Sequence, residues 1–193
     1  MVAILDMQNL KDIPCLILGI GNILWADEGF GVRVVEAFND KYAFTDPNNV
    51  IADGGTLGMY LYDRICRAEK LLIFDCCDFK GKPGELRVLR NDDVKLWTST
   101  KISPHQTGMN DLLVAAAVRG AVPKEIAVVG FQPILLDDYG GSLSPEAKAN
   151  IDEAVRDGYE IVRGWNVGLR ARSEDEIAPA LMAPFHVAGA DIF

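Results

Sequence analysis

Three side chains in this sequence, Glu28, Asp75 and His105, could together bind a divalent transition metal. Two carboxylates and an imidazole supply the oxygen and nitrogen ligands that such an ion accepts, and three ligands leave coordination positions free. Glu28 follows the apolar run 13–20 through a loop, Asp75 ends the apolar run 71–74, and His105 precedes an apolar helical pattern. An open metal site of this kind can polarise a carbonyl or lower the pKa of a bound water.

The elements that carry these residues point to one edge of a parallel sheet. Apolar runs of strand length alternate with helical patterns, which is typical of β–α–β units. The run 13–20 is almost continuously apolar, as expected for a strand that is buried on both faces. Loops that follow different parallel strands converge at the carboxyl edge of the sheet, where ligands bind. We therefore predict an α/β fold with three layers, in which a mostly parallel twisted sheet of about five strands carries helices on both faces.

The chain divides into one patterned region and a tail. We expect strands at 13–20, 49–52, 71–74, 84–90 and 125–131, and helices at 29–42, 58–67, 107–118 and 145–162. Ser144 is expected to cap the last helix, with Pro145 at its first position. Periodicity fades afterwards, so we assign 1–163 to a single α/β domain and 164–193 to a loosely ordered C-terminal extension.

Composition narrows the class of protein. The 193 residues are 49% hydrophobic, enough to bury one core, and the net charge of -9 argues against nucleic acid or an anionic membrane as a partner. We find neither a signal peptide pattern nor an apolar stretch of spanning length. Three of the four cysteines lie in apolar runs, and Cys15 and Cys66 are expected in the core. Reduced thiols fit a cytoplasmic location.

The glycines after the first strand also invite a dinucleotide-binding interpretation. Gly19 and Gly21 match the start of G-x-G-x-x-G, but Leu24 occupies the place of the third glycine. A pyrophosphate would also meet the carboxylates of Asp27 and Glu28, which would repel it. The nucleotide interpretation is therefore weak, and Asp27 is expected instead to cap the following helix.

The string at 18–33 (L-G-I-G-N-I-L-W-A-D-E-G-F-G-V-R) resembles the opening of the nickel–iron hydrogenase maturation endopeptidases, whose pattern is G-x-G-N-x-L-x-x-D-E-x-x-G. Later strings agree in order and approximate spacing: D-G-G-T at 53–56, Asp75 at the end of its strand, and K-I-S-P-H-Q at 101–106. The resemblance extends over residues 14–163.

This resemblance implies an endopeptidase that removes a C-terminal peptide from the nickel-loaded precursor of a hydrogenase large subunit. It assigns nickel binding to Glu28, Asp75 and His105, and an important acid to Asp53. We accordingly expect Glu28, Asp53 and Asp75 to take part in catalysis. The nickel would arrive with the substrate, and other divalent transition metals could occupy the site. Either nickel-activated water or an acid pair that includes Asp53 could break the peptide bond.

Two other functions stay open. A non-catalytic docking protein that senses nickel would bind the precursor without shortening it. A thiol enzyme would use Cys76 or Cys77 with His105 and would be inactivated by alkylation. The acidic neighbours Asp75 and Asp78 argue against the thiol enzyme, because they oppose the low thiol pKa that it needs.

Overall fold

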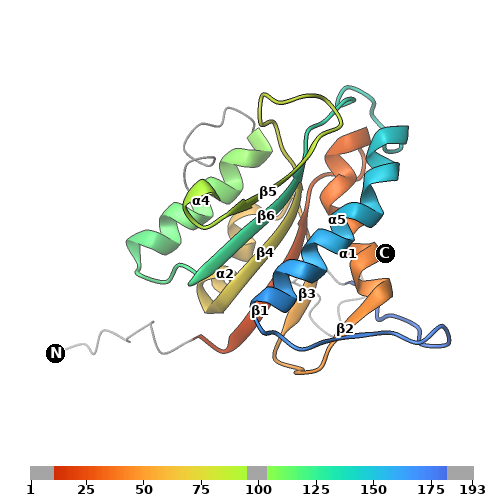
Figure 1. The fold of residues 1–193 in the computed structure, drawn as a ribbon. Helices are drawn as coiled ribbons and strands as arrows, with labels where there is room; N and C mark the ends of the chain where they lie inside the picture. The colour runs from red at the N-terminus through yellow and green to blue at the C-terminus, as the bar shows by residue number, and fades with distance from the viewer. Residues whose placement is uncertain (1–10, 95–103, 182–193) are drawn as a thin grey trace, which may run out of the picture.

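The computed structural model describes residues 11–94 and 104–181, apart from the side chains of 104–108 and 110. Five strands form one sheet in the order β3-β1-β4-β6-β5, in which only β5 is antiparallel to its neighbour (Figure 1). They are β1 (Ile13–Ile20), β3 (Val50–Gly55), β4 (Ala68–Cys76), β5 (Leu86–Arg90) and β6 (Glu125–Phe131). The predicted α/β fold with a mostly parallel sheet is confirmed.

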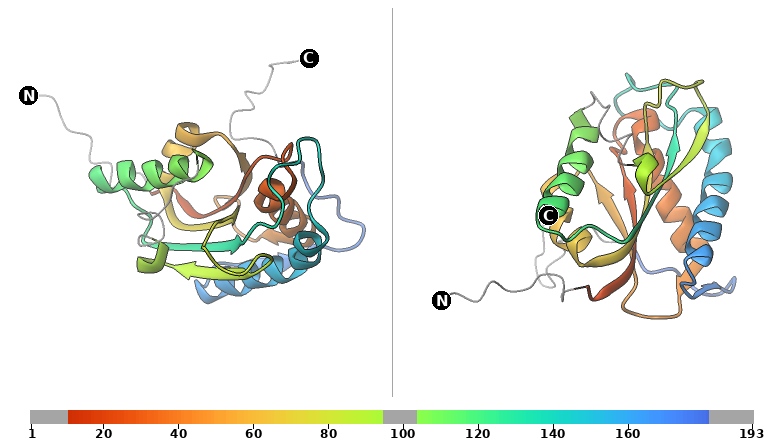
Figure 2. Two further views of the ribbon diagram at one scale, coloured as in Figure 1. Left: turned by 90° about the horizontal axis from the view of Figure 1, so that it is seen from above. Right: turned by 60° about the vertical axis from the view of Figure 1, so that its left-hand side comes forward.

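Helices cover both faces of the sheet (Figure 2). One face carries α1 (Phe30–Lys41) and α5 (Pro145–Gly164). The other carries the 3-10 turn η3 (Gly58–Leu61), α2 (Tyr62–Arg67) and α4 (Pro104–Val118). Among the residues that the structure describes, no helix is both long and apolar enough to cross a bilayer.

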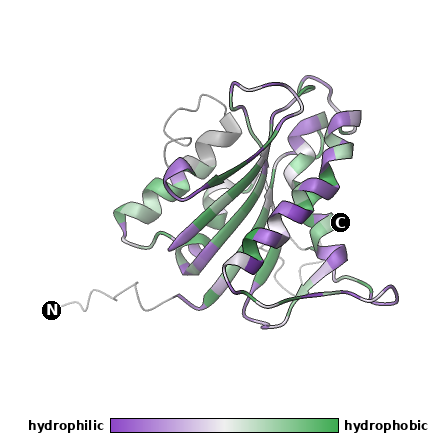
Figure 3. Ribbon diagram, in the orientation of Figure 1, coloured by the Kyte–Doolittle hydropathy of each residue, from purple (hydrophilic) through white to green (hydrophobic). Residues whose placement is uncertain are grey.

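Strand β1 shows why the sheet is apolar on both faces. Cys15 and Ile17 pack into the core layer with α1 and α5, whereas Leu16 and Leu18 pack into the layer with α2 and α4. Successive side chains of a strand point to opposite faces, so a strand between two helical layers must be apolar at every position. Figure 3 shows this as a hydrophobic sheet between helices with hydrophilic outer faces. Burial also raises the pKa of the Cys15 thiol to about 12, and the expected core position of Cys66 is confirmed.

Most element boundaries lie within two residues of the prediction, but β3 ends three residues later, at Gly55, and α4 begins three residues earlier, at Pro104. The helix expected at 58–67 is split into η3 and α2, and β4 begins three residues before the predicted strand, at Ala68. A separate antiparallel pair, β2 (Tyr42–Phe44) with β7 (Leu169–Ala171), was not predicted, because three-residue strands carry little periodic signal. The expected cap of α5 is confirmed, since the Ala147 amide donates to Ser144 Oγ at 3.2 Å.

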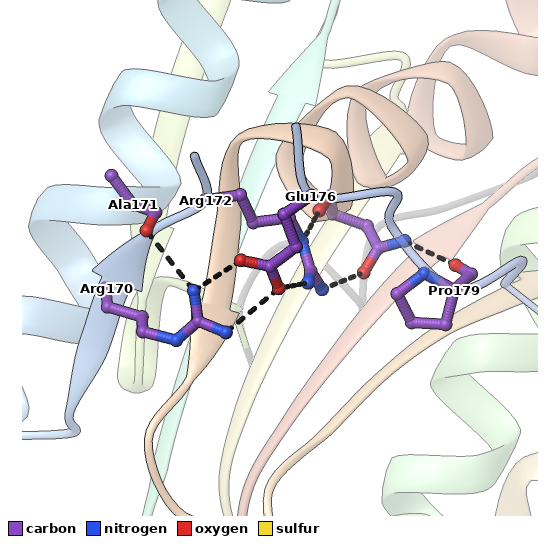
Figure 4. Close-up of polar contacts among 6 residues, drawn as sticks. Arg170, Ala171, Arg172, Glu176 and Pro179 are labelled. Carbon is purple, nitrogen blue, oxygen red and sulfur yellow. Dashed lines mark hydrogen bonds and ion pairs between the residues drawn. The ribbon is translucent and has the colours of Figure 1, made fainter. Parts of the chain in front are cut away.

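Residues 169–179, here called the C-terminal strap, cross the end of α1 (Figure 4). Arg172 Nε donates to the Asn39 carbonyl at 2.7 Å, and Asn39 Nδ2 donates to the Pro179 carbonyl at 2.8 Å. Glu176 accepts from Arg170 and Arg172, and these hydrogen bonds lower the pKa of its carboxyl to about 2. Side-chain hydrogen bonds thus join this part of the expected C-terminal extension to α1. The domain boundary after residue 163 stays a prediction.

Replacing Arg172 tests the strength of that connection. The variant Arg172→Ala leaves the Asn39 carbonyl without its side-chain donor, so we expect a loss of about 1–2 kcal/mol in the free energy of unfolding by urea. Arg163→Ala is the matched control, because Arg163 is exposed and its side chain forms a single 3.6 Å ion pair within the described part of the chain. It should change stability by less than about 0.5 kcal/mol. If Arg172→Ala lowered the free energy of unfolding as little as Arg163→Ala does, the hydrogen bonds of Arg172 would add no measurable stability.

Candidate active site

Asp53 and Asp75 lie on either side of the carboxyl end of β1. The register pairs Gly19 of β1 with Asp53 of β3 and with Phe74 of β4, and Asp75 is the next residue after Phe74. Two strand spacings separate β3 from β4, so the two backbones are roughly 10 Å apart. The sheet itself therefore places both residues at one edge but on opposite faces. Asp53 shares the face of Phe74, which packs with α1, whereas Asp75 contacts Cys77 in the layer with α2 and α4.

Glu28 reaches the same edge through a tight loop. It belongs to the 3-10 turn η2 (Ala26–Gly29), and its carbonyl accepts from the Asn22 amide at 3.1 Å. The Glu28 carbonyl lies so close over Gly21 that a Cβ on Gly21 would be 1.8 Å from it. Gly21 has a φ of 141° and donates to the Gly55 carbonyl at 3.0 Å, next to the end of β3. Glycine at 21 is thus required to bring Glu28 beside the Asp53 segment.

The start of α1 rests directly on the strand ends. A Cβ on Gly31 would lie 2.2 Å from the Phe74 carbonyl and 2.3 Å from the Ile20 carbonyl, so only glycine allows this approach. Because η2 leads straight into α1, Glu28 is held at the carboxyl ends of β1 and β4. The structure therefore places the backbones of Glu28, Asp53 and Asp75 at one edge. The convergence that the sequence predicts is that of Glu28, Asp75 and His105, and it stays a prediction.

His105 belongs to the first turn of α4. This helix ends at Val118 and the chain then enters β6 at Glu125, so α4 runs back along the sheet and begins at the carboxyl edge (Figure 1). The His105 side chain lies outside the described residues. Within the described part, no group of three or more His, Cys, Asp or Glu side chains is arranged to hold a metal ion. Binding of a metal by Glu28, Asp75 and His105 stays a prediction.

The surroundings of Asp53 raise the pKa of its carboxyl overall. Burial raises the pKa of its carboxyl, and the negative charge of Glu36 on α1 raises it further. The Gly55 amide, which donates to Asp53 Oδ1 at 2.8 Å, and the positive charge of Arg33 act in the opposite direction. The net effect is upward, so the ionised carboxylate is a better proton acceptor than an exposed aspartate.

Asp27 has a role that the sequence analysis missed. It is completely buried and does not cap a helix, because η2 has no side-chain cap. Its carboxylate accepts from the Ile134, Leu135 and Ser144 amides at 3.0, 3.0 and 2.7 Å, and from Ser144 Oγ at 3.0 Å. Asp27 thereby fixes the loop before α1 to the loop between β6 and α5. The expectation of a capping role is wrong, because the donors come from residues more than a hundred positions away.

Among the described residues, the surroundings of the two adjacent cysteines are not those of a nucleophile. Cys77 is fully buried and Cys76 nearly so. Cys77 Sγ lies 3.5 Å from Asp75 Oδ2 as a hydrogen-bond donor. Reactive cysteines are partly exposed and lie beside positive charge, so this arrangement argues against a thiol enzyme.

A cleft of about 520 Å³ adjoins the loop that carries Glu28. It lies between α1, the start of α5 and the loop at 140–143, and neither Asp53 nor Asp75 lines it. Arg33, Glu36 and Lys148 give its wall mixed charge. The cleft is thus an extension of the candidate site and not its centre.

Comparison with known proteins identifies the family. The family model described as "Hydrogenase maturation protease" matches residues 32–161. The chain belongs to this family. It is 42% identical over 168 residues to the hydrogenase expression/formation protein HupD of Rhizobium leguminosarum, covering 86% of this chain and 83% of the relative. It is 40% identical over 141 residues to the hydrogenase 2 maturation protease of Escherichia coli, covering 72% and 85%.

Solved structures agree with this assignment. The hydrogenase maturating endopeptidase HybD of Escherichia coli superimposes with a TM-score of 0.77 at 36% identity, over 83% of this chain and 98% of that one. The predicted family and enzyme class, a peptidase, are therefore confirmed. The acid-rich edge of the sheet is the candidate active site of a hydrogenase maturation protease.

Removing the Asp27 carboxylate should destabilise this maturation protease strongly. Asp27→Ala would leave three buried or partly buried backbone amides without an acceptor, so we expect a loss of at least about 3 kcal/mol in the free energy of unfolding. Asp137→Ala, in the exposed loop that Asp27 holds, is the control and should cost less than about 0.5 kcal/mol. Chemical denaturation measures the free energy of unfolding of both variants. A loss for Asp27→Ala as small as that of the control would contradict the role of Asp27 in holding the two loops together.

The charges on α1 should move the pH profile of proteolysis in opposite directions. If ionised Asp53 is the base, activity falls as the pH drops through its pKa. Glu36→Gln removes a charge that raises this pKa, so the acidic limb should shift to lower pH. Arg33→Gln removes a charge that lowers it, so the limb should shift to higher pH. Rate measurements across pH check both signs, and shifts in the same direction would exclude Asp53 as the titrating group.

Proposed function

We propose that this chain is an endopeptidase that removes a C-terminal peptide from the nickel-loaded precursor of a nickel–iron hydrogenase large subunit. In this proposal Glu28, Asp75 and His105 bind the nickel carried by the substrate, and Asp53 acts on the attacking water. Other divalent transition metals would fit the same donors. The observation that carries the proposal is the gathering of Glu28, Asp53 and Asp75 at one sheet edge in a member of the hydrogenase maturation proteases.

The ligand chemistry suits a metal that belongs to the substrate. Carboxylate and imidazole ligands bind nickel, yet three of them leave positions for the ligands that the precursor itself provides. The buried thiols of Cys76 and Cys77 are not needed in the proposed ligand set. Thiolates would hold nickel more tightly, so a set without them favours release of the mature subunit.

The proposed reaction divides the work between the ion and Asp53. Nickel bound at the edge polarises the scissile carbonyl or lowers the pKa of a bound water. Asp53 accepts the proton as water attacks the carbonyl carbon, and the raised pKa of its carboxyl supports this role. The proton then passes to the departing amine nitrogen, which completes hydrolysis. This would make the enzyme an aspartate-assisted peptidase.

The partner and the compartment follow from the same proposal. We infer that the partner is the large-subunit precursor, because the related HybD is described as a hydrogenase maturating endopeptidase. The net charge of -9 disfavours nucleic acid or an anionic membrane as a partner. All four cysteines are buried thiols, which fits the reducing cytoplasm.

Mass spectrometry of the precursor tests the activity. The purified protein should shorten nickel-loaded precursor by a C-terminal peptide and should leave metal-free precursor intact. Asp53→Asn should slow this cleavage by about 10²–10⁴-fold, because the proton acceptor is lost. Asp93→Asn is the control: Asp93 is exposed and follows antiparallel β5, away from the carboxyl edge.

Three outcomes would contradict the proposal in different ways. Nickel-dependent binding with no loss of mass would identify a docking protein. Equal cleavage of metal-free precursor would exclude nickel recognition. Full activity of Asp53→Asn would remove Asp53 from the mechanism.

A further inference from the structure

Exposed apolar side chains gather around the candidate active site. Twelve large apolar residues are exposed in the described part of the chain, and eight of them lie in segments that follow the carboxyl ends of β1, β3 or β6. We call these eight the apolar rim: Ile23, Leu24, Met59, Tyr60, Ile134, Leu135, Leu136 and Tyr139. Scattered exposed apolar residues are ordinary, but a concentration at one edge is typical of a binding surface.

Much of the rim is held in a fixed arrangement. The buried Asp27 carboxylate accepts from the Ile134 and Leu135 amides, which ties the loop of 132–144 to the loop of 21–28. The Gly140 amide donates to the Leu24 carbonyl at 2.8 Å. The rings of Trp25 and Tyr139 make an edge contact with centroids 5.1 Å apart. The two loops therefore present one preformed surface, which lowers the entropic cost of binding a partner.

The rim and the candidate catalytic residues share the same segments. Ile23 and Leu24 lie in the loop that Glu28 closes by accepting from the Asn22 amide. Met59 and Tyr60 lie in η3, a few residues after Asp53. Figure 2 shows the loop after β1 beside the loop after β6, in the view from above. A protein that brings a peptide bond to Glu28 and Asp53 must therefore cover part of the rim.

We propose that the apolar rim is the docking surface for the folded protein substrate of this protease. The inference rests on the proposed function, which makes that substrate the immature large subunit. The complementary partner face is apolar and uncharged, because the centre of a protein interface is depleted in charge and rich in aromatic and aliphatic groups. A second copy of this chain is a poorer occupant, since self-association through the rim would cover Glu28 and Asp53.

A pair of charge-introducing variants tests the surface. The rim variant combines Leu24→Glu and Leu135→Glu, at side chains that are 51% and 38% exposed, one in each loop. The control combines Val118→Glu and Ile177→Glu, at side chains that are 84% and 93% exposed and lie outside the rim. Both proteins gain the same net charge, so a difference between them reports position and not charge.

Binding and cleavage of nickel-loaded precursor are measured separately. We expect the dissociation constant of the rim variant to rise at least about tenfold, with a raised KM and little change in kcat, and the control to match the unmodified protein. Urea denaturation verifies that both variants keep the stability of the unmodified protein.

Each result bears on one claim. Unchanged binding and KM in the rim variant, while the unmodified protein cleaves, would overturn the docking surface and leave the proposed function standing. Weakened binding of the rim variant to a precursor that no form shortens would support the surface and defeat the proposed function. A dimer of the unmodified protein that only the rim variant disperses, with precursor binding unchanged, would assign the rim to self-association and overturn the proposal.

Discussion

The arrangement of the site depends on direct contact between a helix start and two strand ends without intervening side chains. Gly31 approaches the Phe74 and Ile20 carbonyls, and Gly21 approaches the Glu28 carbonyl, at distances where a Cβ would overlap the backbone. A methyl group at either position would push η2 and α1 away from the sheet. Glu28 would then move away from the ends of β1 and β4, and its separation from Asp53 and Asp75 would change. Two missing side chains thus set the geometry of the carboxylates.

The adjacent acids Asp27 and Glu28 do different work because their surroundings differ. Asp27 is buried and its four hydrogen bonds compensate the cost of removing a carboxylate from water. Glu28 is partly buried, with its Oε2 atom enclosed, and lies at the sheet edge beside the ends of β1 and β4. Asp27 therefore holds two loops together, whereas Glu28 is the residue proposed to bind the metal of the substrate. A D-E dipeptide by itself does not reveal that division.

The structural features that could be predicted from the sequence are those determined by residues close together in the chain. Continuous apolar runs predicted strands such as β1 at its observed bounds, and the Ser144–Pro145 pair predicted the start of α5. The position of Asp75 at the carboxyl edge was expected from the general geometry of parallel sheets. The hydrogen bonds that Asp27 accepts from the loop between β6 and α5, and the contacts of the C-terminal strap with α1, were not predictable in this way. Their partners are distant in the sequence, such as Asn39 for Arg172, and no periodic pattern marks such pairs.

The apolar rim and the acidic site impose opposite demands on the same edge of the molecule. Exposed apolar groups favour association, whereas a net charge of -9 opposes it between copies of this chain. A charged copy would be repelled even where the apolar faces match. A substrate that brings a positive metal ion to the carboxylates would meet attraction in addition to apolar contact. Under the proposed function, this combination would favour a metal-carrying protein over a second copy, since only the former would satisfy both the rim and the carboxylates at once.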